Sequence, residues 1–577
     1  MRKKNKLHFN SLISIMNNYL LLLPILLLVY SPEKKNPNKI KETYKSGMVV
    51  SAHPEASKIG VEILKKGGNA VDAAVATGFA LAVCYPAAGN LGGGGFMVFR
   101  FADGKTATLD YREKAPKQAF RDMYLDKDKK VIPEMSLNTQ AASGVPGSVN
   151  GLIEAHNRYG KLPFNEIIQP SIDLAENGFQ ITEKQANSLN SERNDFIRLN
   201  AKKTEFVKEK GNWAKGDLLI QKDLAYTLKL IKEKGKDGFY KGETADKIIA
   251  EMKRGNGIIT LDDLINYKSI WRSALIGHYK GYKVISMPPP SSGGVALLQL
   301  LKMVEPYPLH KWGANDVKSM HLMVEAERLV YADRSMHLGD ADFLFVPVKE
   351  LLDEDYLKER MKSFNENKAR NSKDIKQGKP VRKESEETTH YSITDNFGNA
   401  VSVTTTINDG YGSKIVVAGA GFLLNNEMDD FSIKPGFPNI YGLLGGEVNA
   451  IQGEKRMLSS MTPTILEKDG NLFMVVGSPG GSTIITSVFQ TIVNVIDKGM
   501  GMQEAVSSPR FHHQWYPDVI SIEKDKFDMQ VLQNLERIGH KMEERWAIGR
   551  VDAILLKPDG SYEGGADPRG DDKAVGY

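Results

Sequence analysis

Cysteine is nearly absent from this chain of 577 residues, and Cys84 is the single one. One cysteine allows no internal disulfide, so the stability of the folded state has to come from a large hydrophobic core, which a chain of this length can build. Cys84 lies in the apolar run LAVCYP. We therefore expect it to be a buried and unreactive thiol.

Two common catalytic signatures are also missing. The glycines at 92–95 are not followed by Lys-Ser or Lys-Thr, which excludes a phosphate-binding P-loop and favours a turn where two backbone segments pack closely. No G-x-S-x-G sequence occurs, which excludes the nucleophile elbow of serine hydrolases. The neighbouring His512 and His513 would point to opposite faces of a strand, so they do not indicate a metal site.

Excess positive charge is confined to the start of the chain. The formal net charge is +5, yet residues 1–45 hold nine Lys/Arg and two Glu, which leaves about −2 for the remainder. Nothing in this balance indicates nucleic-acid binding. Basic residues from Arg2 to Lys6 precede an apolar run of 12 residues at 19–30, shorter than the roughly 20 that a spanning helix needs.

This arrangement predicts export, with 1–45 acting as a signal or membrane-anchor segment and linker. The weaker alternative is a buried helix at the start of the core. No small-x-small cleavage site follows cleanly, so removal of the segment and its retention as an anchor both stay open. We expect a periplasmic or secreted protein.

The hydrophobic pattern predicts a folded part of mixed α+β class that begins near Gly47. A strand at 48–52 is followed by a helix at 54–66, and Asn69 is placed to cap a second helix that runs to Ala82. Further helices are predicted at 147–159, 164–176, 222–234, 244–253 and 317–331. Further strands are predicted at 106–110, 282–286, 388–394, 400–407, 472–476 and 551–556.

A marked change of composition lies at 361–387, where only five of 27 residues are apolar. Such a segment buries too little apolar surface to order itself, so we expect it to be exposed and mobile. A solvated linker is the ordinary interpretation. The segment ends at Thr388, where a strand is predicted, and a self-cleaving chain needs this arrangement because the severed tail has to move away.

The predicted strands 388–394 and 400–407 flank the turn DNFGN at 395–399 and indicate a β-hairpin. If Asp395 pairs with Asn399, Thr406 lies opposite Thr388. Directly opposed Cβ atoms are about 5 Å apart, which lets two hydroxyls interact. Threonine is a favoured strand residue, so the pair gains meaning only because Thr388 follows the charged segment.

Ten short motifs occur in order along the chain after residue 47. They are GNLGGGGF at 89, LDYREKAP at 109, GVPGSVNGL at 144, PPPSSGG at 288, TTHYS at 388, NNEMDDF at 425, PGFPNIYGLLGG at 435, MLSSMTPT at 457, GSPGGS at 477 and DPRGDD at 567. In this order and over this length, the sequence resembles the γ-glutamyltransferase (γ-glutamyl transpeptidase) family of N-terminal-nucleophile hydrolases.

The resemblance implies a four-layer αββα sandwich of the N-terminal-nucleophile hydrolase type. It also implies autocleavage between Glu387 and Thr388. The products would be a large subunit, 46–387, with a mobile tail at about 361–387, and a small catalytic subunit, 388–577. The two subunits would stay associated as a heterodimer.

The same resemblance makes Thr388 the nucleophile. Cleavage would release an α-amine on Thr388 itself, and such an amine has an ordinary pKa of about 7.7–8.0, which suits a general base near neutral pH. A threonine hydroxyl needs such a base to be an effective nucleophile. Thr406 would support it from the neighbouring strand, and the backbone N–H groups of Gly480 and Gly481 would stabilise the oxyanion.

A γ-glutamyl group carries a carboxylate and an ammonium away from the amide that is cut. The planar guanidinium of Arg112 suits bidentate contact with the carboxylate, and Ser459 and Ser460 match positions that add hydroxyl donors. The ammonium would be held by Asn408, Glu427 and Asp430. Tyr441 would belong to a lid. The resemblance implies no metal and no cofactor.

The sequence therefore predicts an enzyme that moves the γ-glutamyl group of glutathione and related amides to water, amino acids or peptides. A β-lactam or glutaryl acylase of the same fold is one alternative, against which Arg112 and the serine pair argue. A second alternative is an exported binding protein whose turn at 477–481 holds an anion at a helix N-terminus. That alternative predicts an uncut chain.

Overall fold

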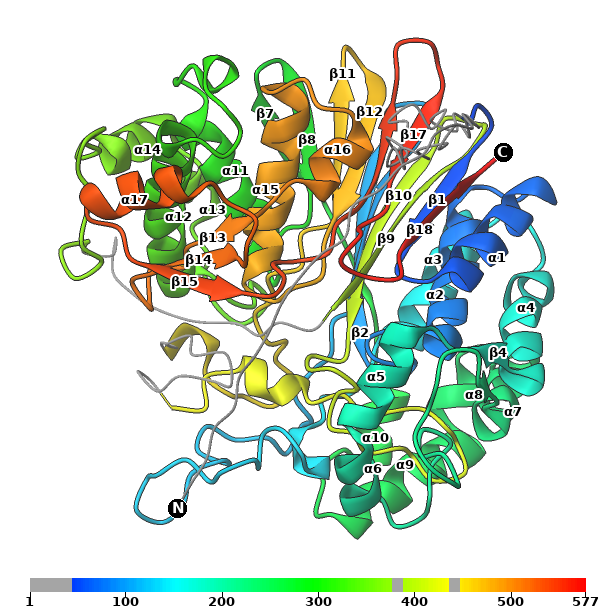
Figure 1. Ribbon diagram of the computed structural model, residues 1–577. Helices are drawn as coiled ribbons and strands as arrows, with labels where there is room; N and C mark the ends of the chain where they lie inside the picture. The colour runs from blue at the N-terminus through cyan, green and yellow to red at the C-terminus, as the bar shows by residue number, and fades with distance from the viewer. Residues whose placement is uncertain (1–43, 376–387, 435–446) are drawn as a thin grey trace, which may run out of the picture. The chain divides into compact units, whose positions relative to one another are not determined.

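A computed structural model describes residues 44–375, 388–434 and 447–577 (Figure 1). In these ranges the strands form two large antiparallel sheets. The first has seven strands in the order β18 (Lys573–Gly576), β1 (Met48–Ser51), β9 (Thr389–Thr394), β10 (Ala400–Thr406), β2 (Gly94–Arg100), β3 (Thr106–Asp110) and β6 (Ile270–Arg272). The second has six strands in the order β17 (Tyr562–Gly565), β16 (Asp552–Leu556), β12 (Asn471–Gly477), β11 (Thr464–Lys468), β8 (Tyr282–Ser286) and β7 (Leu275–Tyr279).

The two sheets pack against each other through one face and against helices through the other. Successive side chains of a strand point to opposite faces, so the apolar run of β2 serves both. Phe96 and Val98 enter the core between the sheets, together with Ile465 and Val475 of the second sheet. Met97 of the same strand faces the helices.

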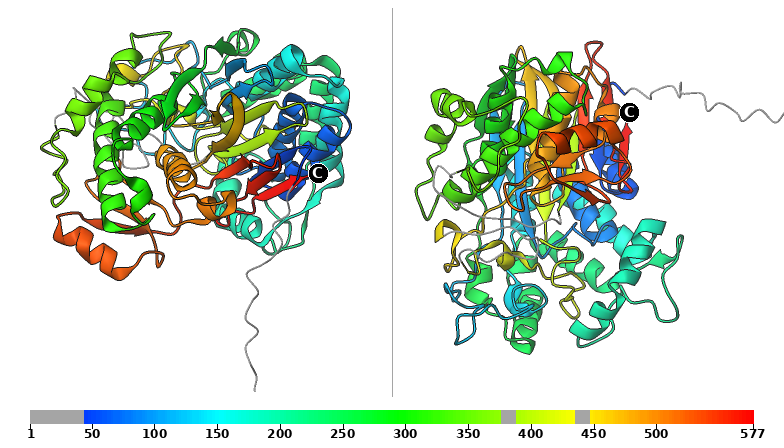
Figure 2. Two further views of the ribbon diagram at one scale, coloured as in Figure 1. Left: turned by 90° about the horizontal axis from the view of Figure 1, so that it is seen from above. Right: turned by 60° about the vertical axis from the view of Figure 1, so that its left-hand side comes forward.

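Helices cover the outer face of each sheet, as Figures 1 and 2 show. Against the first sheet lie α1 (Pro54–Lys65), α2 (Ala70–Cys84) and α3 (Ser148–Tyr159), and α4 (Phe164–Asn177) packs on α2 and on α7 (Lys222–Lys234) further out. Against the second sheet lie α11 (Gly293–Val304) and α15 (Thr483–Ile496), and α12 (Val317–His337) packs on α11. The mixed α/β character predicted from the sequence is confirmed.

Shorter elements complete the described chain. The helices are α5 (Glu183–Ser191), α6 (Arg193–Leu199), α8 (Asp237–Tyr240), α9 (Gly242–Arg254), α10 (Leu261–Ile265), α13 (Val348–Leu351), α14 (Glu354–Met361), α16 (Met502–Ser507) and α17 (Met529–Arg537). Two small sheets pair β4 (Phe179–Gln180) with β5 (Leu218–Leu219), and β13 (Phe511–His512) with β14 (Ile520–Glu523) and β15 (Met542–Arg545).

The start of α2 follows from its sequence. Asn69 accepts hydrogen bonds from the backbone N–H groups of Val71 and Asp72, and the Asp72 side chain accepts one from the Asn69 N–H in return. Every residue of α2 is buried, which explains its apolar composition. The predicted cap is confirmed, and so is the burial of Cys84, which raises the pKa of the thiol.

The hairpin of β9 and β10 has the predicted register. Thr394 pairs with Ala400 and Thr389 pairs with Thr405. The turn is closed by a hydrogen bond of 3.2 Å from the Asp395 N–H to the Asn399 carbonyl. The register prediction is therefore correct along the whole paired length.

Helix α12 is longer than predicted, because it continues from residue 331 to His337. Its final turns carry Asp333 and Arg334, which are buried. Asp333 forms an ion pair with Arg360 at 2.7 Å, and Arg334 donates to Ser292 at 2.9 Å. These partners are distant in sequence, so the polar residues looked like the end of the helix.

The expectation of exposure at 361–387 holds for most of residues 361–375, but this part of the segment is anchored at several points. Ser372 and Ile375 are buried, and Arg370 pairs with Glu325 of α12 at 2.5 Å. Paired charges and a few apolar anchors hold the segment where apolar content alone could not. Residues 376–387 lie outside the described part of the chain.

No helix in the described ranges is both long enough and apolar enough to cross a bilayer. The predicted signal or anchor segment lies almost wholly outside these ranges, which begin at Tyr44.

Candidate active site

Nine of the ten residues predicted for catalysis and donor binding line one small cavity of about 10 Å³, which is room for about one water molecule. Its lining comes from positions far apart in the sequence: Arg112, Thr388, Thr406, Asn408, Glu427, Asp430, Ser459, Ser460 and Gly481, with Met461 and Ile484 beside them. The tenth predicted residue, Gly480, directly precedes Gly481. The fold thus brings the whole predicted set together.

Thr388 immediately precedes β9, an inner strand of the first sheet, and is only 5% exposed. The last pair of the hairpin is Thr405 with Thr389, and Thr406 and Thr388 are the next residues on its two sides. The Thr406 Oγ accepts a hydrogen bond of 2.8 Å from the Asn408 N–H. The two predicted threonines therefore share one end of the hairpin.

The glycine run at 92–95 packs against this end of the hairpin. A Cβ on Gly93 would lie 2.0 Å from the Thr406 carbonyl oxygen, and a Cβ on Gly95 would lie 2.5 Å from that of Thr404. Both distances are far inside contact, so only glycine fits. The predicted close-packing turn is confirmed, and its role is to let the backbone approach Thr406.

Gly480 and Gly481 form the turn between β12 and α15. Their φ angles of +129° and +54° lie in the region that favours glycine. The Thr483 N–H donates to the Gly480 carbonyl at 3.0 Å, and the Ile484 N–H donates to that of Gly481 at 3.1 Å. The carbonyl groups of the two glycines therefore accept the first hydrogen bonds at the start of α15.

Arg112 is buried among three carboxylates. Its guanidinium donates to Glu427, and to Asp430 at 2.5 Å, while a Glu113 oxygen lies 3.5 Å from Nη1. The Met457 carbonyl also accepts from Nε at 3.4 Å. The arginine therefore has a fixed position and is surrounded by negative charge.

Burial dominates the protonation of this cluster. It raises the pKa of Glu113 to about 7 and raises those of Glu427 and Asp430, while the positive charge of Arg112 opposes the shift. Three carboxylates around one guanidinium would leave an excess of negative charge if all were ionised, and the raised pKa values favour keeping protons on them until a positive group arrives. The cluster is therefore suited to a ligand that brings its own positive group as well as a negative one.

Ser459 and Ser460 are held by the loop at 288–294. The Ser459 carbonyl accepts from the backbone N–H and the hydroxyl of Ser292, both at 2.7 Å. The Ser460 hydroxyl accepts from Arg334 at 3.1 Å. The motifs PPPSSGG and MLSSMTPT therefore form one structural unit.

Asn425 joins three further motifs. Its side-chain oxygen accepts from the N–H groups of Gly144 and Glu427, at 2.8 and 3.0 Å, and its amide donates to the Gly92 carbonyl at 2.7 Å. The short helix Glu427–Asp430 starts two residues after it. This network fixes the two acidic residues opposite Arg112.

The sequence and the fold are similar to those of known proteins. The sequence model of the family described as Gamma-glutamyltranspeptidase matches residues 56–577. The chain belongs to this γ-glutamyltranspeptidase family. It is 48% identical over 535 residues to the glutathione hydrolase proenzyme of Escherichia coli (strain K12), which covers 92% of each chain.

Two solved structures are similar to this member of the γ-glutamyltranspeptidase family. The cephalosporin acylase from Bacillus halodurans has a TM-score of 0.84 and 27% identity, and the match covers 95% of this chain and 99% of that one. The Helicobacter pylori γ-glutamyltranspeptidase has a TM-score of 0.57 and 45% identity, and the match covers 58% of this chain and 97% of that one.

Two residues of this γ-glutamyltranspeptidase site were not predicted from the sequence. Glu113 directly follows Arg112, and neither of its carboxylate oxygens has a hydrogen-bond partner in the described structure. The sequence pointed to Glu113 only through its position next to Arg112 in the motif LDYREKAP. Arg334, which contacts Ser460, gave no signal because it lies beyond the predicted end of its helix.

The histidines near the motifs are structural. His390 is buried between Thr404 and Ser392, at 2.9 and 3.0 Å, and burial lowers its pKa to about 3. His512 and His513 are buried too, and His512 contacts Thr486 at 2.9 Å. Among the described residues, the group with metal-ligand spacing is His321, Glu325 and His540, none of which lines the cavity at Thr388.

Glu387 and Tyr441 lie outside the described residues. The predicted cleavage site is therefore described only on its Thr388 side, and the lid prediction stays a prediction.

Proposed function

We propose that this protein is an autoprocessed γ-glutamyltransferase with glutathione hydrolase activity. The observation that carries the proposal is the single cavity at Thr388, which collects residues from five of the ten motifs and from the segment 406–408, in a chain that matches the family over 56–577. Its substrates are glutathione and related γ-glutamyl amides. Its acceptors are water, amino acids and peptides.

Maturation starts in the intact chain. The Thr388 hydroxyl attacks the carbonyl carbon of Glu387, the Glu387–Thr388 amide bond breaks, and the amide nitrogen leaves as the α-amine of Thr388. The resulting ester between Glu387 and the Thr388 oxygen is then hydrolysed by water. The products are a free carboxylate on Glu387 and a Thr388 that carries both a hydroxyl and an amine.

The new amine is the base for turnover. It takes the proton of the Thr388 hydroxyl as the oxygen attacks the γ-carbonyl of the donor. The N–H groups of Gly480 and Gly481 stabilise the negative oxygen of the tetrahedral intermediate, and losing such a donor typically costs about 10²–10³ in rate. The proton passes to the leaving amine, and water or an acceptor amine then cleaves the γ-glutamyl ester.

The charges around Arg112 account for donor recognition. The α-carboxylate of the donor takes one edge of the guanidinium, and the α-ammonium takes the carboxylates of Glu427 and Asp430 with the side chain of Asn408. Separating a buried ion pair is costly unless each partner gains a new one. A zwitterionic donor supplies both, and Ser459 and Ser460 add hydroxyl donors to its carboxylate.

The finer organisation is part of the same proposal. The two packed sheets with their outer helices support a four-layer αββα sandwich of the N-terminal-nucleophile hydrolase type. The large subunit is 46–387 and the small one is 388–577. The basic and apolar start of the chain supports export to the periplasm or beyond, and Tyr441 belongs to a lid over the donor.

An acylase acting on β-lactams is the second candidate, because a cephalosporin acylase shares the fold at a TM-score of 0.84. The buried Arg112 with its carboxylates favours an amino-acid donor over a glutaryl chain, which has a carboxylate but no ammonium to pair with Glu427 and Asp430. Release of the chromophore from a γ-glutamyl anilide, accelerated by glycylglycine, supports the first function. Activity on a glutaryl β-lactam alone supports the second.

A denaturing gel with N-terminal sequencing tests the maturation step. The purified protein should give two bands, and the smaller should start at Thr388. The variant Thr388→Ala should give one band and no turnover. An active protein that is intact between residues 387 and 388 would falsify the proposed function.

A further inference from the structure

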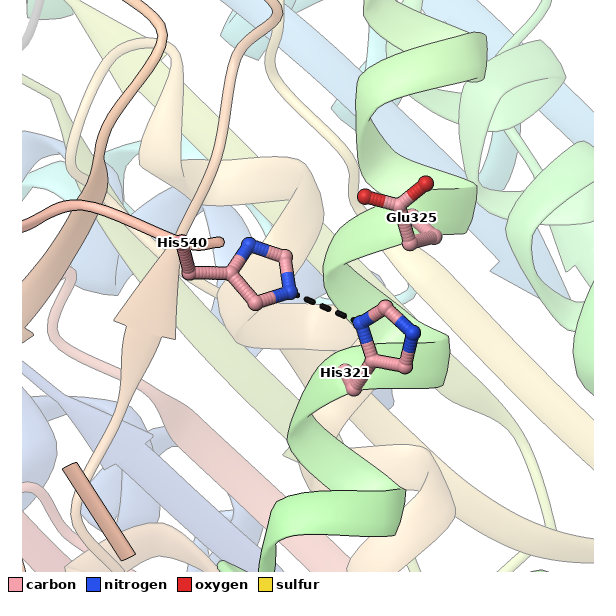
Figure 3. A group of neighbouring side chains, drawn as sticks. All are labelled: His321, Glu325 and His540. Carbon is pink, nitrogen blue, oxygen red and sulfur yellow. Dashed lines mark hydrogen bonds between the residues drawn. The ribbon is translucent and has the colours of Figure 1, made fainter. Parts of the chain in front are cut away.

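A pair of histidines and a glutamate lie together outside the site at Thr388. His321 and Glu325 are one turn apart on α12, so both side chains point the same way, and His540 faces them from the link between α17 and β15 (Figure 3). The three are 2%, 0% and 5% exposed. One ligand atom from each lies within 4.8 Å of the others.

The hydrogen bonds of the pair fix which nitrogens are available. The Nε2 of His321 lies 2.8 Å from the Asn365 carbonyl, which can only accept, so this nitrogen carries a proton and the Nδ1 carries a lone pair. That Nδ1 lies 2.7 Å from the Nε2 of His540. A ring N–H that donates to a backbone carbonyl is the usual partner of a metal-ligating histidine.

Two further observations suit a cation that is held by nitrogen. The Nδ1 of His540 is buried without a hydrogen-bond partner in the described structure. His540 also lines a cavity of about 1100 Å³, which offers an entry path.

The charges around the cluster are balanced. Glu325 accepts from Arg328 at 3.2 Å and from Arg370 at 2.5 Å, and Arg328 also pairs with Asp518. Two guanidiniums therefore face two carboxylates. The arginines hold the Glu325 carboxylate in place, and their charge makes the site weaker for a dication than one without them.

We propose that His321, Glu325 and His540 form a binding site for a divalent transition-metal ion, with Zn²⁺ as the expected occupant. Two imidazoles and a carboxylate form a set that Zn²⁺ accepts, and a water from the cavity completes four ligands. The ion takes the place of the proton between the two rings, and His540 moves that proton from Nε2 to Nδ1. Metal–nitrogen bonds of about 2.0–2.1 Å at a tetrahedral angle need the two nitrogens about 3.3 Å apart, so the rings separate slightly.

The ligands lie on both sides of Thr388, since His321 and Glu325 precede it and His540 follows it. If the chain is cleaved before Thr388 as proposed above, a bound ion would join the two subunits. Zn²⁺ should then raise the thermal unfolding midpoint of the cleaved protein, and should leave that of His540→Gln unchanged.

Zn²⁺ binding to the full chain tests the site, by competition with a chromophoric chelator. The Thr388→Ala variant is used so that the result does not depend on cleavage. We expect one Zn²⁺ per chain, and none in His540→Gln or His321→Gln. The control is His310→Gln, which removes an exposed histidine elsewhere and should still bind one ion.

The proposal is overturned if the chain takes up no stoichiometric Zn²⁺, or if His540→Gln binds as much as the unsubstituted chain. Far-ultraviolet circular dichroism checks that the variants fold. If they do not, X-ray absorption on the Zn²⁺-loaded parent decides the matter. Two imidazole ligands support the site, and an oxygen-only environment overturns it.

Discussion

Arg112 is the centre of the charged network in the candidate site, because Glu113, Glu427 and Asp430 all contact its guanidinium. The family motifs identified Arg112, Glu427 and Asp430 from the sequence. They did not show that the three form a buried network, because pairing across hundreds of residues follows from the fold. For the same reason, the sequence showed Glu113 as part of the motif LDYREKAP but not as the fourth residue of this network.

The Arg112→Lys variant tests the bidentate contact. Lysine keeps the charge and loses the planar fork, so one or two charged hydrogen bonds to the donor are lost. At about 1.5–3 kcal/mol for such a bond, kcat/KM should fall roughly 10–150-fold. The matched control is Arg121→Lys, which alters an arginine paired with the exposed Glu447 and should leave kcat/KM unchanged.

The raised pKa of Glu113 predicts a pH dependence of stability. In the folded chain the carboxyl keeps its proton up to about pH 7, whereas the unfolded one releases it near 4.5. The folded state thus binds more protons between these values, so this group makes the protein less stable as pH rises from about 4.5 to about 7.

Glu113→Gln stays neutral and should remove that part of the slope. Thermal midpoints of the parent and of Glu113→Gln should therefore differ more at pH 8 than at pH 5, in favour of the variant. An equal difference at both pH values would mean that Glu113 does not titrate in this range.

At the scale of the element, the hairpin of β9 and β10 was predictable to the residue, because the turn DNFGN fixes its register. The end of α12 was not, because Asp333 and Arg334 look like surface residues until Arg360 and Ser292 are in place. The contacts that anchor the segment at 361–375 were missed for a similar reason. Its apolar content is low, but Arg370 pairs with Glu325 on α12, which precedes it in the chain.

The glycine turn beside the hairpin gives a prediction for this element. In Gly93→Ala the new Cβ would lie 2.0 Å from the Thr406 carbonyl oxygen, so the backbone has to move away from Thr406. Overpacking of this kind costs about 1–3 kcal/mol. We expect a lower thermal midpoint and slower appearance of the two bands on a denaturing gel.

Gly313→Ala is the control for this change. A Cβ there meets only the Asp316 side chain, at 3.4 Å or more. Its midpoint and its rate of band formation should match those of the parent. If Gly93→Ala also matched the parent, the turn would not position the threonine end of the hairpin.

At the scale of the whole molecule, each large sheet combines strands from before and after Thr388. In the first sheet β9 and β10 lie between β1 and β2, and in the second β11 pairs with β8. No sequence pattern revealed this order, because pairing between distant strands depends on the assembled core. Each proposed subunit therefore lacks the neighbours that its strands require.

Cleavage at Thr388 should consequently leave one particle. The two chains should elute together on size exclusion at the volume of the uncut Thr388→Ala variant, and should separate only in denaturant. Residues 388–577 produced alone should not fold, because β9 and β10 then expose both edges. A folded, soluble 388–577 fragment would contradict this expectation.

Because each sheet combines strands from both sides of Thr388, folding has to precede self-cleavage. Thr388 reaches the cavity only when β1 and β2 from the first half have accepted β9 and β10 from the second. Self-cleavage can therefore take place only after the strands of the first sheet have paired. A chain that misfolds, or whose synthesis is not complete, has no active Thr388 and does not cleave the amides of other molecules.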